Sequence, residues 1–282
     1  MSKNTKFGVL YIVATPIGNL EDITKRALNT LSIVDLCAVE DTRKSKILMN
    51  KYNISTKLIS YHKFSEQKKL QYLITKIKKG LNVALISDSG TPLISDPGYL
   101  LVKRAQEESI KVIPIPGASS LISAISVSGF STDKFTFYGF PPKQKKAKKS
   151  FMHSLISENK TSIVFESKRR IIDFLKTLEE LSPGTKIFVA REMTKLHETF
   201  YRGEVTRVIK DISSKENSQK GEFVVVISGK KEVDQDIFLT SEQKEVLVMI
   251  LEKMNKKDAL TLASKAFGLK KNFLYKHLLK QK

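Results

Sequence analysis

Two carboxylates, Asp88 and Asp96, belong to a loop of small residues that follows an apolar strand. The segment from residue 82 to residue 98 reads NVALISDSGTPLISDPG. Glycine lets a backbone approach a ligand closely, proline fixes a turn, and open α/β sheets bind ligands at the carboxyl ends of their strands. An acidic loop of this kind is also a common structural turn. The segment therefore indicates a binding site only if other loops support it.

Four further loops of the same kind follow apolar strands. They are Thr15 to Asn19, Glu40 to Arg43, Pro116 to Ser120 and Glu166 to Lys168. Because the carboxyl ends of parallel strands meet at one edge of a sheet, we expect these loops to line one crevice. Carboxylates in such a crevice suit ribose hydroxyls, backbone amides suit a small carboxylate, and apolar walls suit a purine.

The sequence lacks the motifs of several other kinds of site. The chain has no G-x-x-x-x-G-K-S/T phosphate loop, no G-x-G-x-x-G dinucleotide turn and no G-x-S-x-G elbow. One cysteine and four scattered histidines argue against a zinc cluster, so we expect no metal. Cys37 lies in an apolar strand pattern, which fits a reducing, cytoplasmic compartment. We find neither a signal-peptide pattern nor an apolar run approaching the roughly 18 residues of a membrane span.

Strands and helices alternate along the first part of the chain, which predicts a parallel sheet of βα units. The expected strands there are 9–14, 35–39, 58–62, 83–86 and 112–115. From residue 129 the pattern changes, and Pro141-Pro142 ends a predicted strand at 135–140. Further strands are expected at 162–165 and 186–190, followed by a hairpin-like pair at 198–205 and 222–228 with a helix between its members.

We expect the chain to divide into three parts. Residues 1–117 form a first α/β domain, residues 118–230 form a second that completes the crevice, and residues 237–282 form a helical module. In that module a helix, a turn at Gly268 and a second helix are typical of a helix-turn-helix that binds nucleic acid. A small three-helix cap with a solvated lysine face fits the same pattern.

The charge balance points to a polyanionic partner. The chain carries 49 Lys and Arg against 29 Asp and Glu, a net charge of +20. Such an excess attracts nucleic acid first and anionic membrane second, although a lysine-rich proteome would produce it without function. The expected RNA-binding cations are Arg43, a run after Pro142 that we predict to be a mobile loop, and a set in the helical module. The run is Lys143, Lys145, Lys146, Lys148 and Lys149, and the set is Lys265, Lys270, Lys271, Lys276 and Lys280.

Segments of the chain resemble a known family. TPIGNLEDIT, AVEDTR, ISDSGTPLISDPG, PIPGASS and YGFPP occur in this order, followed by ARE, TK and HE. They are similar to the tetrapyrrole-methylase superfamily of S-adenosylmethionine-dependent enzymes, and within it to the branch that methylates the ribose 2′-hydroxyl of a cytidine in 16S rRNA. The resemblance covers about residues 8–230, and a weaker resemblance extends to the tail. It implies a two-domain α/β fold with mixed sheets flanked by helices, a homodimer, and the 30S ribosomal subunit as partner.

The resemblance also implies roles for particular residues. The cofactor-binding positions would be Pro16, Gly18, Ser87, Asp88, Gly90, Thr91, Asp96, Ser119, Ser120 and Phe165. A ribose 2′-hydroxyl is a weak nucleophile and needs a base or an orienting acceptor. The candidates for that role are Glu40, Asp41 and Glu192, with Asp88 and His197 as further possibilities. The alternative is that Glu40 pairs with Arg43, and Glu192 with Arg191.

Two other functions remain open at this stage. A methylase of a small molecule, such as a tetrapyrrole intermediate, would use the same fold but would need neither the +20 charge nor a helical tail. A non-enzymatic nucleic-acid-binding regulator would explain the tail but not five ligand-type loops. Binding of S-adenosylmethionine separates the regulator from the two enzymes, and the methyl acceptor separates the enzymes from each other.

Overall fold

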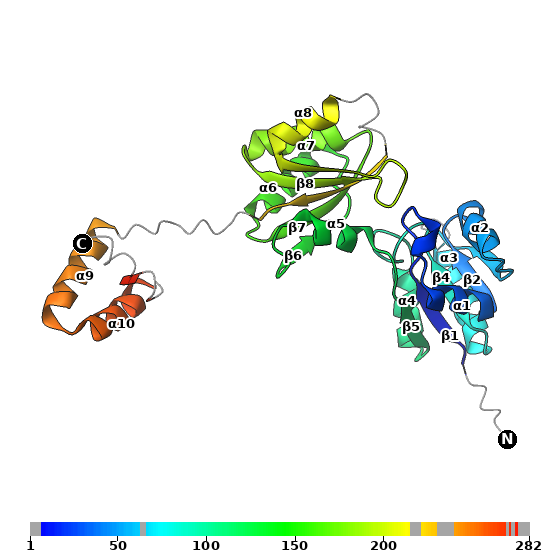
Figure 1. Cartoon of the computed structure of the whole chain (residues 1–282). Coiled ribbons are helices and arrows are strands. Elements are labelled where there is room, and N and C mark those ends of the chain that lie inside the picture. The colour runs from blue at the N-terminus through cyan, green and yellow to red at the C-terminus, as the bar shows by residue number, and fades with distance from the viewer. Residues whose placement is uncertain are drawn as a thin grey trace, which may run out of the picture. The chain divides into compact units, whose positions relative to one another are not determined.

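The computed structural model describes residues 7–62, 66–214, 221–229, 240–268, 271, 274 and 275. The chain forms two compact units, residues 1–231 and residues 232–282. The larger unit contains two five-stranded sheets (Figure 1). The predicted division of this unit at residues 117/118 falls between the last strand of the first sheet and the first helix of the second half, and it stays a prediction.

The first sheet is parallel throughout, with the strand order β3-β2-β4-β1-β5. Its strands are β1 (Val9–Val13), β2 (Leu36–Val39), β3 (Lys57–Ser60), β4 (Val83–Ile86) and β5 (Lys111–Ile115). The connecting helices are η1 (Leu20–Asp22), α1 (Lys25–Ile33), α2 (Thr42–Lys51), α3 (Glu66–Lys78) and α4 (Tyr99–Glu107). The sequence predicts all five strands correctly, with ends within two residues of those observed.

Helices cover both faces of this sheet, as parallel sheets require. On one face α1 and α2 contribute Leu31 and Met49 to a core that includes Cys37. On the other face α3 and α4 contribute Ile74 and Leu101. Every residue of β2 and β4 is buried, so these two strands read as continuous apolar runs rather than alternating ones.

The second sheet is mixed, with the order β6-β7-β10-β8-β9. Its strands are β6 (Phe135–Phe137), β7 (Thr161–Ser167), β8 (Lys186–Arg191), β9 (Thr199–Glu204) and β10 (Glu222–Ile227). Its helices are α5 (Ser120–Ser128), α6 (Lys145–Ser157), α7 (Ile171–Leu181) and α8 (Val205–Ser213). Residues of α5 pack on one face, and residues of α6, α7 and α8 pack on the other (Figure 1). Only β6 and β7 pair in parallel.

The predicted hairpin-like pair is wrong. The strands expected at 198–205 and 222–228 do not pair with each other, because β10 lies between β7 and β8 while β9 pairs with β8 at the edge. Burial explains the order. Five of the six residues of β10 are buried, which suits a central strand, whereas β9 has a single buried residue, Tyr201.

The predicted mobile lysine loop is also wrong from residue 145 onward, where α6 begins. Lysine and alanine favour helices, and the run continues into Phe151, Met152, Leu155 and Ile156, which place apolar side chains on one helical face. The strand expected at 135–140 ends earlier, at Phe137. The lysine run is therefore the first part of an amphipathic helix rather than a loop.

The smaller unit contains α9 (Ser241–Lys253) and α10 (Lys256–Phe267), which Gly268 ends in a left-handed conformation. It has its own apolar core, formed by Leu247, Leu260, Ala263 and Leu274. Most of the predicted last helix, residues 271–279, lies outside the described residues, as do Lys270, Lys276 and Lys280. Lys265 and Lys271 are exposed. Its helix-turn-helix role stays a prediction. None of the described helices combines the length and apolar character needed to cross a membrane.

Candidate functional site

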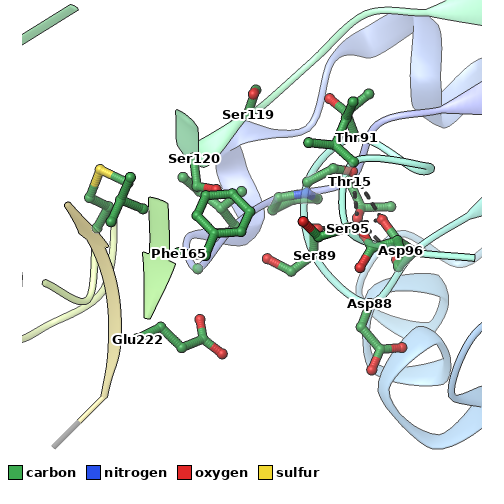
Figure 2. A pocket seen from close by; sticks show the side chains of 18 of the residues that line it. Thr15, Asp88, Ser89, Thr91, Ser95, Asp96, Ser119, Ser120, Phe165 and Glu222 are labelled. Carbon is green, nitrogen blue, oxygen red and sulfur yellow. Dashed lines mark hydrogen bonds between the residues drawn. The ribbon is translucent and has the colours of Figure 1, made fainter. Parts of the chain in front are cut away.

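The strand-end loops of both sheets converge on one cavity of about 870 Å³ within the larger unit. The loops after β1, β2, β4 and β5 supply one wall, and the ends of β7 and β8 supply the other. Because β10 runs antiparallel to β7 and β8, its first residues lie at the same edge and also line the cavity. In Figure 2, Phe165 and Glu222 lie on one side of the cavity, and Asp88 and Asp96 lie on the other.

The structure brings together every residue that the resemblance assigned to the cofactor. The cavity is lined by Pro16, Gly18, Ser87, Asp88, Gly90, Thr91, Asp96, Ser119, Ser120 and Phe165. These residues come from separate loops and strand ends in both halves of the unit. Their contact with a cofactor stays a prediction, but their common location is observed.

The loop after β4 is fixed against the end of β1. Thr15 and Gly90 exchange two backbone hydrogen bonds, with N–O distances of 2.9 and 3.1 Å. The hydroxyl of Thr15 donates to the carbonyl of Ser87 at 3.2 Å. Gly90 has a φ of +82°, a left-handed conformation that side chains with a Cβ rarely adopt. The glycine therefore allows the tight approach of this loop to β1.

Asp88 joins two of the loops. One of its carboxylate oxygens accepts a hydrogen bond from the backbone N–H of Asp41 at 2.9 Å, and the other accepts one from Lys44 at 2.8 Å. The first contact holds the turn between β2 and α2, and the second is an ion pair to the first part of α2. Asp88 thus positions Glu40, which precedes Asp41 at the end of β2.

Asp96 and Glu40 are carboxylates with raised pKa values. Burial is the main cause of the rise in the pKa of Asp96 to about 6, and the charges of Glu40 and Asp88 add to it, although a hydrogen bond from Ser87 opposes it. Burial, followed by repulsion from Asp88, also raises the pKa of Glu40 above its usual range. Glu40, Asp88 and Asp96 therefore lie close enough together at this end of the cavity for their charges to repel one another.

Glu192 holds the loop that follows β8. Its Oε1 atom accepts hydrogen bonds from Lys195 and from the backbone N–H of Glu222, both at 2.9 Å. Burial raises the pKa of Glu192, but these donors outweigh it and leave the pKa below its ordinary value. Lys195 also bonds the Glu222 carboxylate at 3.0 Å. Glu192 is therefore engaged in holding the loop in place.

This loop also meets the first sheet. The backbone N–H of Asn19 donates to the hydroxyl of Thr194 at 3.0 Å. A Cβ atom on Gly18 would lie 2.5 Å from Lys195 Cγ and 2.7 Å from Thr194 Oγ1, so only glycine fits at this crossing. The two walls of the cavity are thereby in direct contact.

The predicted base candidates differ in their surroundings. Asp41 lies outside the cavity lining, caps α2 and pairs with Arg43, and hydrogen bonds from Arg43 lower the pKa of Asp41 to about 2. The Arg43 side chain itself is 88% exposed. His197 also lies outside the lining. Glu40 and Glu192 both line the cavity, and of these two Glu192 is engaged by Lys195.

Sequence reasoning missed several lining residues. Lys44 and Lys195 face the cavity from a helix and a loop, and Phe140 faces it from the segment after β6. Gly221 and Glu222 line it from the amino end of β10. A rule based on the carboxyl ends of strands cannot find residues at an amino end. The antiparallel pairing of β10 was the missing information.

The lining is acidic although the protein is strongly basic. It contains six carboxylates, Glu40, Asp88, Asp96, Glu166, Glu192 and Glu222, and three amines, Lys44, Lys168 and Lys195. The whole chain has a net charge of +20. Opposite charges attract most strongly away from bulk water, so the cavity suits a cationic ligand such as the sulfonium of S-adenosylmethionine. Among the described residues, no group of three or more His, Cys, Asp or Glu is arranged to hold a metal ion.

Comparisons with known proteins agree with the fold and the site. The family model described as Tetrapyrrole (Corrin/Porphyrin) Methylases matches residues 9–209. The crystal structure of uroporphyrin-III-C-methyltransferase from Thermus thermophilus is similar in fold, with a TM-score of 0.53 at 16% identity over 79% of this chain and 94% of that one.

Several curated relatives carry the name ribosomal RNA small subunit methyltransferase I, among them proteins from Haemophilus influenzae and Thermotoga maritima. The protein from Haemophilus influenzae is 42% identical over 95% of both chains. The protein from Thermotoga maritima is 46% identical and is matched along 100% of its length by 79% of this chain. This chain belongs to the tetrapyrrole methylase family, and within it to the ribosomal RNA small subunit methyltransferase I group. It is a methyltransferase.

Proposed function

We propose that this protein transfers a methyl group from S-adenosylmethionine to the ribose 2′-hydroxyl of a cytidine in the 16S rRNA of the 30S subunit. The observation that carries the proposal is an acidic cavity inside a chain with a net charge of +20. A cationic cofactor suits the cavity, while the phosphates of RNA suit the basic surface outside it. A single protein therefore offers two electrostatic environments to two ligands of opposite charge.

Ribosomal RNA is favoured over a tetrapyrrole as the methyl acceptor. The two relatives described above are named for ribosomal RNA, and they are far more similar to this chain than the tetrapyrrole enzyme is. A small-molecule substrate would not account for the positive charge or for a separate helical unit. Both features suit a large polyanion.

The reaction is a displacement in which positioning contributes most of the acceleration. S-Adenosylmethionine supplies the methyl group on a sulfonium sulfur. We propose that the loop from Ser87 to Asp96, together with Ser119 and Ser120, holds the cofactor. Glu40 accepts the proton of the 2′-hydroxyl while the ribose oxygen forms its bond to the methyl carbon and the carbon–sulfur bond breaks. Asp88 positions Glu40 through the N–H of Asp41.

The test measures transfer of a labelled methyl group to 30S subunits, with tetrapyrrole substrates as the alternative acceptors. Only the subunits should be labelled, and the label should lie on a ribose. Substitution Glu40→Gln should lower kcat by roughly 10²- to 10⁴-fold and leave the affinity for S-adenosylhomocysteine within about twofold. Glu21→Gln, which changes a carboxylate outside the lining, is the matched control.

The outcomes separate the two parts of the proposal. Unlabelled subunits in the presence of wild-type protein would refute the function. Labelled subunits together with an unchanged kcat for Glu40→Gln would refute only the assignment of the base.

We also propose that the protein forms a two-fold homodimer, from the family resemblance and the prevalence of this symmetry. Light scattering that finds only single chains at micromolar concentration would refute the dimer. The proposed substrate places the protein in the cytoplasm.

A further inference from the structure

Two exposed apolar side chains border the cavity. Phe140 is 53% exposed and Ile94 is 39% exposed, although both line the cavity. Their segments lie against each other, because a Cβ atom on Gly139 would be 3.3 Å from Ser95 Oγ. Apolar groups that border a cavity and remain open to solvent indicate a ligand that covers them.

Phe140 is held on a fixed backbone. The carbonyl of Gly139 accepts a hydrogen bond from the N–H of Phe165 at 2.9 Å, and the carbonyl of Pro141 accepts one from Arg170 at 3.0 Å. Arg170 in turn pairs at 2.8 Å with Glu166, whose side chain is buried. The residues on both sides of Phe140 are thus bonded to the end of β7 and the start of α7. An exposed ring on such a support is ordered before any ligand binds.

A second aromatic ring supports the first. Phe165 meets Phe140 edge to face, with ring centroids 5.5 Å apart and an interplanar angle of 64°. In an edge-to-face pair only one ring presents its edge, so a flat surface remains available for a third ring to stack. Phe165 is visible beside the cavity in Figure 2.

Exposed cations follow both Phe140 and Phe165 along the chain. Lys143 and Lys146 follow it after the two prolines, and both are exposed. Lys168 and Arg169 are also exposed, and they follow Phe165 at the end of β7. An exposed aromatic ring among cations is the combination that binds unpaired nucleotides, in which the base stacks and the phosphates are neutralised. S-Adenosylmethionine has an adenine but no phosphate, so the cations favour RNA as the ligand of this ring.

We propose that Phe140 is the platform on which the target nucleobase stacks once it has left the RNA helix, with Lys168 and Arg169 holding the adjoining phosphates. Enzymes that modify a nucleotide inside folded nucleic acid commonly extrude it into a pocket, where an aromatic side chain stacks on the base. The Glu166–Arg170 pair positions the platform through Pro141. This proposal rests on the proposed function and names the residue that would hold its substrate.

The test compares Phe140→Ala, Phe140→Leu and Phe140→Tyr in methyl transfer to 30S subunits. Phe140→Ala should lower kcat/KM by roughly 5- to 150-fold, the cost of losing one stacked base. The kcat/KM of Phe140→Leu should lie between those of Phe140→Ala and the parent. The kcat/KM of Phe140→Tyr should stay within about threefold of the parental value. Calorimetry should give the same affinity for S-adenosylhomocysteine, within about twofold, for all four proteins.

The matched control is Phe135→Ala, which removes a ring that is 38% exposed on β6 but outside the cavity lining. It should leave both measurements unchanged. Parental kcat/KM for Phe140→Ala would overturn the platform. A loss of S-adenosylhomocysteine affinity as large as the loss of methyl transfer would also overturn it, because the ring would then serve the cofactor. Wild-type protein that labels no subunits would refute the proposed function itself, which is a different result from either of these.

Discussion

At the scale of single residues, Asp96 couples the cavity to pH. Its pKa is 3.8 in the absence of perturbation and about 6 in the folded protein. The folded state therefore binds more protons than the unfolded state between these two values, and the free energy of unfolding falls as the pH rises through this window. Above pH 6 the ionised, partly buried carboxylate of Asp96 lowers the free energy of unfolding by a constant amount. Such a destabilising group is typical of a functional site.

Asp96→Asn should remove this cost. In the absence of ligand we expect the variant to unfold at a higher temperature than the parent at pH 7.5, and we expect the difference to disappear near pH 4. Its affinity for S-adenosylmethionine should be lower than that of the parent at pH 7.5, because the variant has no carboxylate to face the cation. Thermal unfolding and calorimetry across pH 4–8 measure both effects. A variant with the parent's unfolding temperature at every pH would contradict the raised pKa of Asp96.

The cavity residues of the loop after β4 were predictable because the residues next to them in the sequence form a distinctive pattern. Asp88, Gly90 and Asp96 stand in a loop where polar residues interrupt apolar ones after a strand, which is visible in one dimension. The contact between Glu192 and the N–H of Glu222 was not predictable. It joins residues that the pairing of β8 with β10 brings together, and the sequence contains no local sign of it, whereas Lys195 lies only three residues from Glu192.

At the scale of elements, α6 carries lysines in two different environments. Lys146 and Lys149 are exposed, whereas Lys148 is only 14% exposed and pairs with Asp173 on α7. The cations of one helix turn therefore serve different purposes. Only the exposed ones are available for phosphate groups, and the third helps hold α6 against α7.

Substitution of Lys146 and Lys149 by Gln should weaken binding of 30S subunits and reduce the salt dependence of that affinity. The log–log slope should fall by roughly 0.7 for each phosphate of a single strand that the variant no longer neutralises. The affinity for S-adenosylhomocysteine should stay the same. Filter binding at several salt concentrations measures the slope, with Lys148→Gln as the control that should lower thermal stability instead. An unchanged slope would show that Lys146 and Lys149 are solvated surface residues that do not neutralise phosphates.

The elements that sequence reasoning misplaced have different causes. The helical spacing of the apolar residues in α6 is local and was overlooked beside the lysine run, whereas the position of β10 depends on β7 and β8, which lie elsewhere in the chain. The parallel strands of the first sheet were easier to predict, since the central ones are buried on both faces and read as apolar runs. A mixed sheet does not reveal its strand order in this way.

At the scale of the whole molecule, the compact unit of residues 1–231 contains the complete cavity. The unit of residues 232–282 has a separate core. The Thermotoga maritima relative is matched along its entire length by 79% of this chain, so about a fifth of this chain has no counterpart in it. A protein of the same group can thus exist with a shorter chain.

A chain that ends at Gly229 should therefore fold and bind S-adenosylhomocysteine with the parental affinity. We expect it to bind 30S subunits more weakly than the full chain and with a smaller salt dependence, because it lacks the exposed lysines of the tail. Calorimetry and filter binding of the two proteins test this directly. Equal affinity and slope for the subunit would show that the tail does not contact RNA.

The hydrogen bond between Asn19 and Thr194 spans 175 residues of sequence, and it has a consequence for synthesis of the protein. Domains generally begin to fold from the amino end while the chain is still being made. The first sheet needs only residues up to Ile115, but the opposite wall needs β8, β10 and the loop at Thr194. A nascent chain can therefore complete half of its scaffold long before it has a site. Cofactor capture must wait until nearly all of the larger unit has emerged from the ribosome.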